Sequence, residues 1–158
     1  MIRSGIGYDI HRFAKERKLI LGGVEIPHSH GLEGHSDADV LSHAIADALL
    51  GATGAGDIGQ HFPNTEESLR GISSLEILKR VTKMLAERRT RIANIDATII
   101  AEAPKIAPHV SAMRQKIADA TGLSESNVNV KATTNESLGA IGRAEGMAAI
   151  AIATVEVD

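Results

Sequence analysis

The sequence predicts an α/β fold of the α+β sandwich type, in which one mixed β-sheet packs against three helices. Three observations support this fold class. Three segments repeat apolar residues at helical spacing, other segments alternate like strands, and the two kinds of segment interleave along the chain. The chain has 158 residues, enough for one well-buried core, so we expect a single domain over residues 1–158.

The composition indicates a core with few aromatic side chains. Hydrophobic residues make up 43% of the chain, aromatic residues only 2%, and 15 residues are glycine. Such a core consists of Ala, Ile, Leu and Val between closely approaching backbones. It is thin for one protomer, so we expect the chain to bury more apolar surface by forming oligomers.

Charge and cysteine content argue against several classes of protein. A net charge of −3 and few aromatic rings disfavour a nucleic-acid-binding protein. No apolar run reaches membrane-spanning length, so no membrane partner is expected. With no cysteine and no signal-like opening segment, a reducing compartment is expected. We therefore predict the bacterial cytoplasm; a plastid protein whose leader has been removed is the alternative.

Five segments have the residue pattern of strands. They cover residues 2–13, 18–27 (two strands about Gly22 and Gly23), 91–101, 128–133 and 147–157. Residues 28–34 are expected to form a loop. The last segment is apolar at both alternating sets of positions, which is typical of a strand covered on both faces.

Three helices are predicted from apolar periodicity, at residues 36–51, 73–89 and 110–120. The first two begin with capping-box spacing, Ser36 with Asp39 and Ser73 with Glu76. Residues 51–72 contain five glycines and one proline with little periodicity. That is long for a simple connection and is more typical of a binding loop or lid.

A candidate metal site lies in the first strand and the first helix. Side chains two residues apart on a strand share a face, so Asp9 and His11 point the same way, and the helix can bring His43 to them. One carboxylate and two imidazoles leave a tetrahedral zinc ion one free position, as in catalytic zinc sites. From spacing alone, a turn-capping Asp and two ordinary polar His residues explain the pattern equally well.

Two further segments carry residues suited to phosphates and nucleotides. His35 precedes a helix N-terminus, which favours anions. Residues 131–136 offer Thr hydroxyls, and Glu136 could coordinate Mg²⁺ beside a diphosphate, with Arg143 following. Residues 101–106 expose main-chain groups that could hold a base. Taken singly, a surface loop residue, a glycine-rich turn and a proline-containing connection explain these three features better.

Six segments together carry the motifs of one known family, in the same order and over nearly the whole chain. They are Gly7–His11, Leu21–Val24, His35–Val40, Gly56–Gly59 with Phe62 and Pro63, Asp96–Ala101, and Asn129–Thr134. In these segments the sequence resembles the 2-C-methyl-D-erythritol 2,4-cyclodiphosphate synthases of the non-mevalonate isoprenoid pathway. This collinearity is far more specific than any one motif.

The resemblance implies both an assembly and a reaction. The family forms homotrimers with active sites between protomers. Its substrate is 4-diphosphocytidyl-2-C-methyl-D-erythritol 2-phosphate, whose 2-phosphate attacks the β-phosphate, closing a cyclic diphosphate and releasing CMP. The implied cofactors are one Zn²⁺ per protomer and a second divalent ion, Mg²⁺ or Mn²⁺.

The family's functional residues fall on specific positions of this chain. Asp9, His11 and His43 match the zinc ligands, and Glu136 matches the residue that binds the second ion through the diphosphate. His35 and Thr134 match the catalytic residues that stabilise the transition state. The positions that match substrate contacts are Asp9, His11, His35, Ser36, Asp57, Ile58, Gly59, Phe62, Pro63, Asn64, Thr65, Glu66, Ala101, Lys105, Ile106, Ala107, Thr133, Thr134, Asn135, Glu136, Ala140 and Arg143.

The substrate contacts divide into groups by the part of the substrate that they meet. Residues 57–59 and 62–66 match the erythritol-binding segment, and residues 101–107 match the cytidine pocket. Thr133 matches a residue beside the diphosphate, and Arg143 a basic residue near the trimer axis.

Departures from the family pattern are few. Asn64 stands where the family commonly has Asp, and Tyr8 and Ala140 stand where relatives carry Phe, near a cavity in which some members hold isoprenoid diphosphates. Three other functions are compatible with parts of this pattern. They are a metal-dependent phosphohydrolase, a non-catalytic trimer that binds phosphate ligands, and an Fe(II) oxygenase with a two-His-one-carboxylate site.

Overall fold

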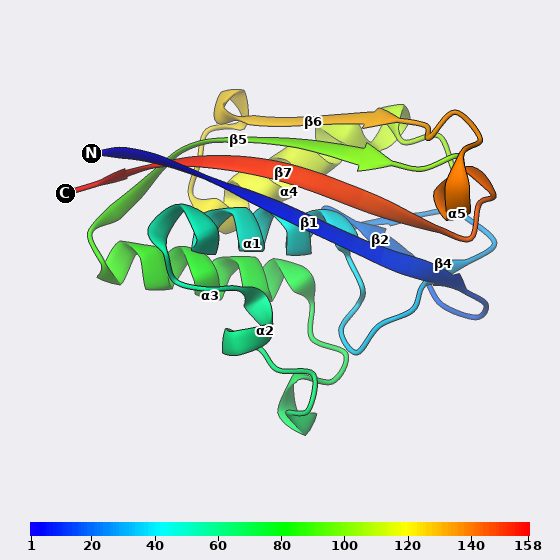
Figure 1. Ribbon diagram of the computed structural model, residues 1–158, viewed down its shortest axis with the longest axis horizontal. Coiled ribbons are helices and arrows are strands. Elements are labelled where there is room, and N and C mark those ends of the chain that lie inside the picture. Colours follow the sequence, from blue (N-terminus) through cyan, green and yellow to red (C-terminus); the bar gives the residue numbers. More distant parts are fainter.

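The structure is a computed structural model that describes residues 1–158. A layer of helices covers one face of a β-sheet, and a small hairpin lies beside them (Figure 1). The strands are β1 (Ile2–Ala14), β2 (Leu19–Leu21), β3 (Val24–Ile26), β4 (Gly31–Leu32), β5 (Thr90–Ile100), β6 (Val128–Thr133) and β7 (Gly146–Val157). The α-helices are α1 (Val40–Thr53), α2 (Ile58–His61), α3 (Ser74–Glu87), α4 (Val110–Thr121) and α5 (Gly139–Gly142), with 3₁₀ turns at Glu67–Leu69, Ala107–His109 and Glu125–Asn127.

The main sheet is mixed, as predicted. Its five strands run in the order β4-β1-β7-β5-β6, and β5 and β6 are parallel while the other pairs are antiparallel. β2 and β3 form a separate hairpin. β1 and β7 pair from Ile2 opposite Glu156 to Arg12 opposite Gly146, so the two ends of the chain lie side by side (Figure 1).

Helix α1 packs directly on β1 because glycine leaves room for it. A Cβ atom at Gly7 would overlap the Ala44 carbonyl oxygen, and one at Gly5 would overlap the Ala48 carbonyl oxygen. This approach is the close backbone contact that the glycine content predicted. It brings His43, the residue before Ala44, beside the β1 strand that carries Asp9 and His11.

The predicted start of the first helix is wrong by four residues. Ala38 has a positive φ of 55°, which a helix cannot contain, so Ser36 and Asp39 form no capping box. Asp39 is instead the N-cap of α1, and its carboxylate accepts hydrogen bonds from the Ser42 amide at 3.0 Å and from Gly22 and Gly23 at 2.9 and 2.8 Å. The same carboxylate therefore ties the β2–β3 turn to α1.

Other boundaries differ from prediction by small shifts with local causes. α1 continues past Gly51 to Thr53, because the left-handed C-cap is Gly54. Ser73 precedes α3 but makes no side-chain cap, and Glu76 pairs with Arg80. The expected loop 28–34 includes the short strand β4, which pairs with the end of β1.

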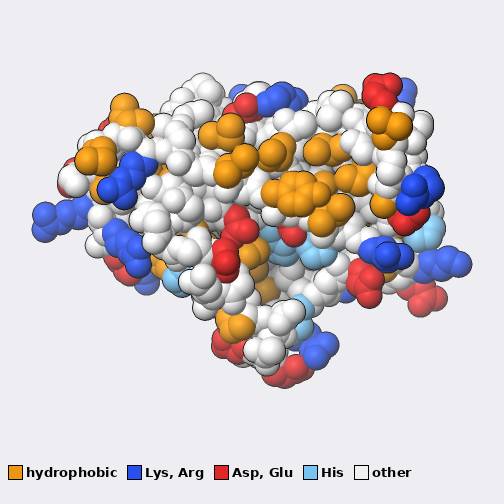
Figure 2. Space-filling view, in the orientation of Figure 1, with side chains coloured by type: hydrophobic (Ala, Val, Ile, Leu, Met, Phe, Trp, Pro, Cys, Tyr) orange, Lys and Arg blue, Asp and Glu red, His pale blue; other side chains and the backbone are white.

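The final strand is covered on one face only within a protomer. Ala149, Ala151 and Ala153 of β7 are buried under the helices. On the other face Ile150 and Ile152 are 36% and 48% exposed. They lie across from exposed residues of β1, and Figure 2 shows hydrophobic side chains gathered in a band over these strands. A single chain therefore leaves the second face of β7 uncovered, and the predicted cover would have to come from another molecule.

Candidate active site

The predicted metal ligands lie together. Asp9 and His11 project from the same face of β1, and His43 reaches them from the first turn of α1. His11 Nε2 lies 2.9 Å and His43 Nδ1 lies 3.0 Å from the same oxygen, Asp9 Oδ2. The three donor atoms lie within 4.8 Å of one another. A carboxylate oxygen and two imidazole nitrogens that converge in this way could bind a metal ion.

The protonation of His11 fits a metal site. Its Nδ1 lies 2.6 Å from the Glu33 carbonyl oxygen, which can only accept, so Nδ1 carries the hydrogen. Nε2 therefore presents a lone pair toward Asp9, and it is buried without a hydrogen-bond partner. An orphaned buried lone pair facing a carboxylate is costly unless a cation lies between them, so the three residues fit a divalent metal.

The electrostatics of the group keep Asp9 ionised. Burial raises the pKa of Asp9, but the imidazoles of His11 and His43, which donate hydrogen bonds to the carboxylate and carry positive charge when they are protonated, outweigh burial and lower it to about 2. Burial lowers the pKa of His11, but the protonated ring can donate a hydrogen bond to Asp9 and is attracted by its negative charge, which produces a net rise in that pKa. The site therefore holds a negative charge at neutral pH and favours a positive one beside it.

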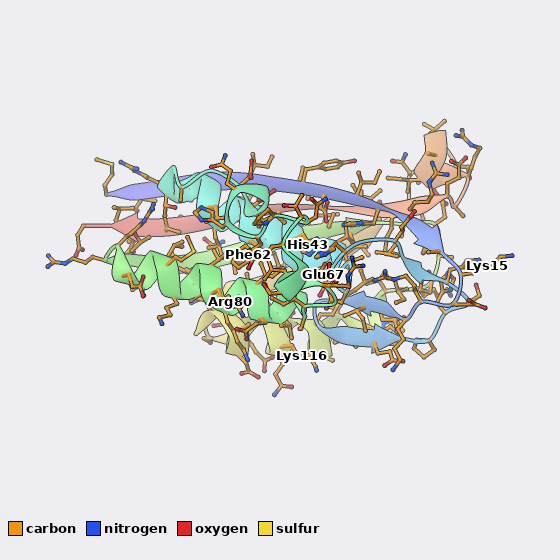
Figure 3. All side chains as sticks on the ribbon, turned by 90° about the horizontal axis from the view of Figure 1, so that it is seen from below. Lys15, His43, Phe62, Glu67, Arg80 and Lys116 are labelled. Carbon is orange, nitrogen blue, oxygen red and sulfur yellow. The ribbon has the colours of Figure 1, made fainter.

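The three residues lie at the base of a cavity of about 450 Å³. Of the residues predicted from the sequence, those that line it with the metal group are His35, Ser36, Ile58, Gly59, Phe62, Pro63, Asn64 and Thr65. Leu69, Ile72 and Ile77 add an apolar wall that the sequence analysis did not predict. In Figure 2 the surface is hollowed beneath the hydrophobic band, and Figure 3 shows His43 near Phe62 when seen from below.

Two predicted residues of this segment lie outside the cavity lining. Asp57 caps α2, where its carboxylate accepts a hydrogen bond from the Gln60 amide at 3.0 Å. Glu66 accepts a hydrogen bond from the Ser68 hydroxyl at 2.6 Å. Both side chains are exposed, so any contact they make with a ligand stays a prediction.

Residues 54–73 are anchored at both ends beside the metal group. At the near end, Asp47 Oδ1 accepts a hydrogen bond from the Ile58 amide at 2.8 Å. At the far end, the Gly71 amide donates to the His35 carbonyl at 2.9 Å. Asp47 follows His43 by one helical turn, so α1 presents both a metal ligand and an anchor for the segment that lines the cavity.

The second set of predicted residues lies at the carboxyl ends of β5 and β6. The Ala101 amide donates to the Thr133 carbonyl at 3.0 Å, which joins the two ends. The side chains of Lys105, Ala107, Thr133, Thr134 and Glu136 are exposed, and Asn135 is half-buried. Ala101 and Ile106 have buried side chains, so they can meet a ligand only through the main chain. None of these residues lines the cavity that holds Asp9, His11 and His43.

Glu102 organises this second region and was missed by the sequence analysis. Its Oε1 accepts hydrogen bonds from the Asn135 amide at 2.9 Å and the Ser137 amide at 3.2 Å. These bonds hold a turn in which Glu136 and Ser137 both have positive φ, at 50° and 60°. The carboxylate thereby fixes the loop that carries Thr134 and Glu136. The only feature of the sequence that could have indicated this role is that Glu102 is an acidic residue directly after a predicted strand.

Ala140 lies in α5 and Arg143 directly follows that helix, a few residues before β7 begins. Ala140 lines a smaller cavity of about 190 Å³ with Ile10, His11 and Arg12 of β1. Arg143 does not line it, and its guanidinium pairs with Glu145 at 2.7 Å. The structure therefore places Ala140 near the candidate metal ligand His11, whereas Arg143 lines neither cavity.

Comparison with known proteins gives the family. The model of the YgbB family matches residues 2–156. A 2-C-methyl-D-erythritol 2,4-cyclodiphosphate synthase of Alkaliphilus metalliredigens is 59% identical over 154 residues, which is 98% of this chain and 97% of the relative. The chain belongs to the YgbB family, whose relatives carry this synthase name.

Solved structures of YgbB-family synthases have the same fold. The bifunctional IspDF of Campylobacter jejuni superposes with a TM-score of 0.96 at 42% identity, covering 100% of this chain and 43% of that one. A CDP complex of IspF from Plasmodium falciparum has a TM-score of 0.87 at 33% identity, covering 99% of this chain and 97% of that one. None of the helices combines the length and the apolar character that a membrane span needs.

Proposed function

We propose that the chain converts 4-diphosphocytidyl-2-C-methyl-D-erythritol 2-phosphate to 2-C-methyl-D-erythritol 2,4-cyclodiphosphate with release of CMP. This is the cyclising lyase activity of its family in isoprenoid biosynthesis. The observation that carries the proposal is the convergence of Asp9, His11 and His43 at the base of the cavity, within a chain of that family. Residues 1–158 would act as one synthase domain, and its location in the cytoplasm stays a prediction.

Asp9, His11 and His43 would hold a zinc ion. They supply one carboxylate and two imidazoles, with a buried lone pair on His11 Nε2 facing the carboxylate. When bound, such an ion supplies Lewis-acid stabilisation of negative charge on a phosphate oxygen. Glu136 is exposed beside Thr134 and would bind Mg²⁺ or Mn²⁺ together with the diphosphate.

The reaction needs no nucleophile from the protein. An oxygen of the 2-phosphate forms a bond to the β-phosphorus, and the bond from that phosphorus to the bridging oxygen breaks, so CMP leaves with the electron pair. Because attacker and target belong to one molecule, the protein mainly holds the two phosphates in line. His35 and Thr134 would donate hydrogen bonds to oxygens that gain charge in the transition state.

The other side chains would bind the two ends of the substrate. Residues 57–59 and 62–66 would hold the erythritol part, since most of them line the cavity with Ser36. Residues 101–107 would bind cytidine through main-chain groups and Lys105, because the Ala101 and Ile106 side chains are buried. The Plasmodium falciparum relative was solved as a CDP complex, which supports a cytidine nucleotide as ligand.

A homotrimer with sites between protomers would unite the two regions. Within one chain, the cytidine residues and Thr133 to Glu136 do not line the metal cavity, although one substrate must reach both. An apolar face on β1 and β7 is exposed, with Ile6 65% and Tyr8 55% accessible. A second copy packed on this face would cover it and bring one protomer's cytidine region toward another's metal group. Ala140 and Arg143 would then lie toward the trimer axis.

Reaction in water enriched in ¹⁸O tests the intramolecular step. A phosphohydrolase, the rival enzyme reading, adds a water oxygen to one of its products, whereas cyclisation adds none. We expect neither CMP nor the cyclic product to carry ¹⁸O when the products are analysed by mass spectrometry after complete conversion. One labelled oxygen in CMP or in a linear phosphorylated product, absent from a control without protein, would establish hydrolysis and contradict the proposal.

A further inference from the structure

The ring of His43 makes a second set of contacts on the side away from Asp9. Its Nε2 lies 2.8 Å from the Ser74 hydroxyl and 3.2 Å from the Ser36 hydroxyl. Ser74 is fully buried and is the first residue of α3, 31 positions along the chain from His43. A hydroxyl can donate or accept, so the geometry at Nε2 alone does not decide which nitrogen of His43 carries the hydrogen.

Asp37 determines which nitrogen of His43 carries the hydrogen, and it does so through Ser74. The Ser74 hydroxyl donates a short hydrogen bond to Asp37 Oδ1. The Asp37 carboxylate also accepts from the Ser74 amide at 3.0 Å and from the Asp39 amide at 3.1 Å, so its position is fixed at the start of α3. An ionised carboxylate only accepts, and therefore the single hydroxyl hydrogen of Ser74 points to Asp37. What Ser74 offers to His43 is a lone pair.

We propose that Ser74 and Asp37 are positioning residues for metal binding, which hold His43 in the tautomer with its hydrogen on Nε2. Nδ1 then keeps its lone pair toward Asp9 and the metal position. The inference rests on the proposed metal site. His11 has a similar contact, because its non-ligating nitrogen Nδ1 donates to the Glu33 carbonyl oxygen. In both residues the nitrogen that does not face the metal position is therefore held as a donor.

Ser36 could stabilise the other tautomer of His43 if the contact with Ser74 were lost. Its hydroxyl accepts from the Ala38 amide at 3.1 Å and keeps a hydrogen that can point at His43 Nε2. If Ser74 no longer accepts from Nε2, Ser36 can donate to it, and the hydrogen of the ring moves to Nδ1, where Asp9 accepts it. That arrangement satisfies the polar groups without a metal and blocks the ligating nitrogen.

Zinc affinity tests the proposal without reference to turnover. Purified wild-type and variant proteins would compete with a chromogenic chelator for Zn²⁺. We expect Ser74→Ala to bind Zn²⁺ about 10- to 100-fold more weakly, the usual effect of removing a residue that orients a ligand. Ser74→Thr keeps the hydroxyl and is expected to stay near wild type. Ser73→Ala is the matched control, because Ser73 is exposed and makes no side-chain cap.

A second measurement needs no variant. Long-range ¹H–¹⁵N spectra of the metal-free wild-type protein report which nitrogen of a neutral imidazole carries hydrogen. We expect His43 to be protonated at Nε2, and in Ser74→Ala to shift toward Nδ1. Protonation at Nδ1 in the wild type, or equal zinc affinity for wild type and Ser74→Ala, would overturn the inference. A wild-type protein that binds no zinc would instead contradict the proposed metal site itself.

Discussion

Replacing His43 with alanine is expected to lower kcat by at least about a thousandfold, because the change removes one of the three proposed metal ligands and one of the two imidazoles beside Asp9. The rate of CMP release measures the loss, and the zinc content of the purified variant should fall with it. The cavity shape should change little, since Ser36 and Phe62 stand on other segments.

His28→Ala is the control for this experiment. His28 is exposed and lies outside both groups of proposed site residues, so its replacement should leave kcat and zinc content unchanged. If His43→Ala folds normally by circular dichroism and still has wild-type turnover, the proposed metal site has no role in the reaction.

If the chain forms the proposed homotrimer, Ile152→Glu is expected to separate it into single chains. Ile152 lies opposite Ile6 at the middle of the exposed apolar face, and the two are 48% and 65% accessible in a single chain. Burying an unpaired carboxylate costs several kcal/mol, and three-fold symmetry would repeat the cost at each interface. Light scattering should change from three times the chain mass of 16.7 kDa to that mass alone.

Activity should disappear with the assembly while the fold remains. The two groups of site residues do not share a cavity in one protomer, so a separated protomer cannot bind both ends of the substrate. Lys79→Glu places the same carboxylate on the exposed side of α3 and should leave mass and activity unchanged. A fully active Ile152→Glu protomer would show that each chain holds a complete site.

Local patterns predicted the parts of the site that lie on regular elements. The two-residue period of a strand placed Asp9 and His11 on one face, and helical periodicity placed His43 on α1. Mixed topology and the strand at Val128–Thr133 were also confirmed. The predicted start of α1 was wrong because the positive φ of Ala38 depends on contacts made by its neighbours, Asp37 and Asp39, with distant residues.

Contacts between distant segments could not be predicted. Ser74 meets Asp37 across 37 positions, and Glu102 meets Asn135 across 33, so no local spacing relates them. Both are polar residues whose partners are set by the packing of helices and strands. The apolar outer face of β7 was visible in the sequence, but what covers it cannot be derived from local residue patterns.

³¹P NMR of the products tests the central claim most directly. The protein would be incubated with 4-diphosphocytidyl-2-C-methyl-D-erythritol 2-phosphate and Mg²⁺, with and without prior removal of zinc by a chelator. The account predicts two coupled phosphorus signals of a cyclic diphosphate together with the signal of CMP, and their loss on chelation. Inorganic phosphate or a linear product would show a hydrolase, and unchanged substrate would show a binding protein; either result would contradict the account.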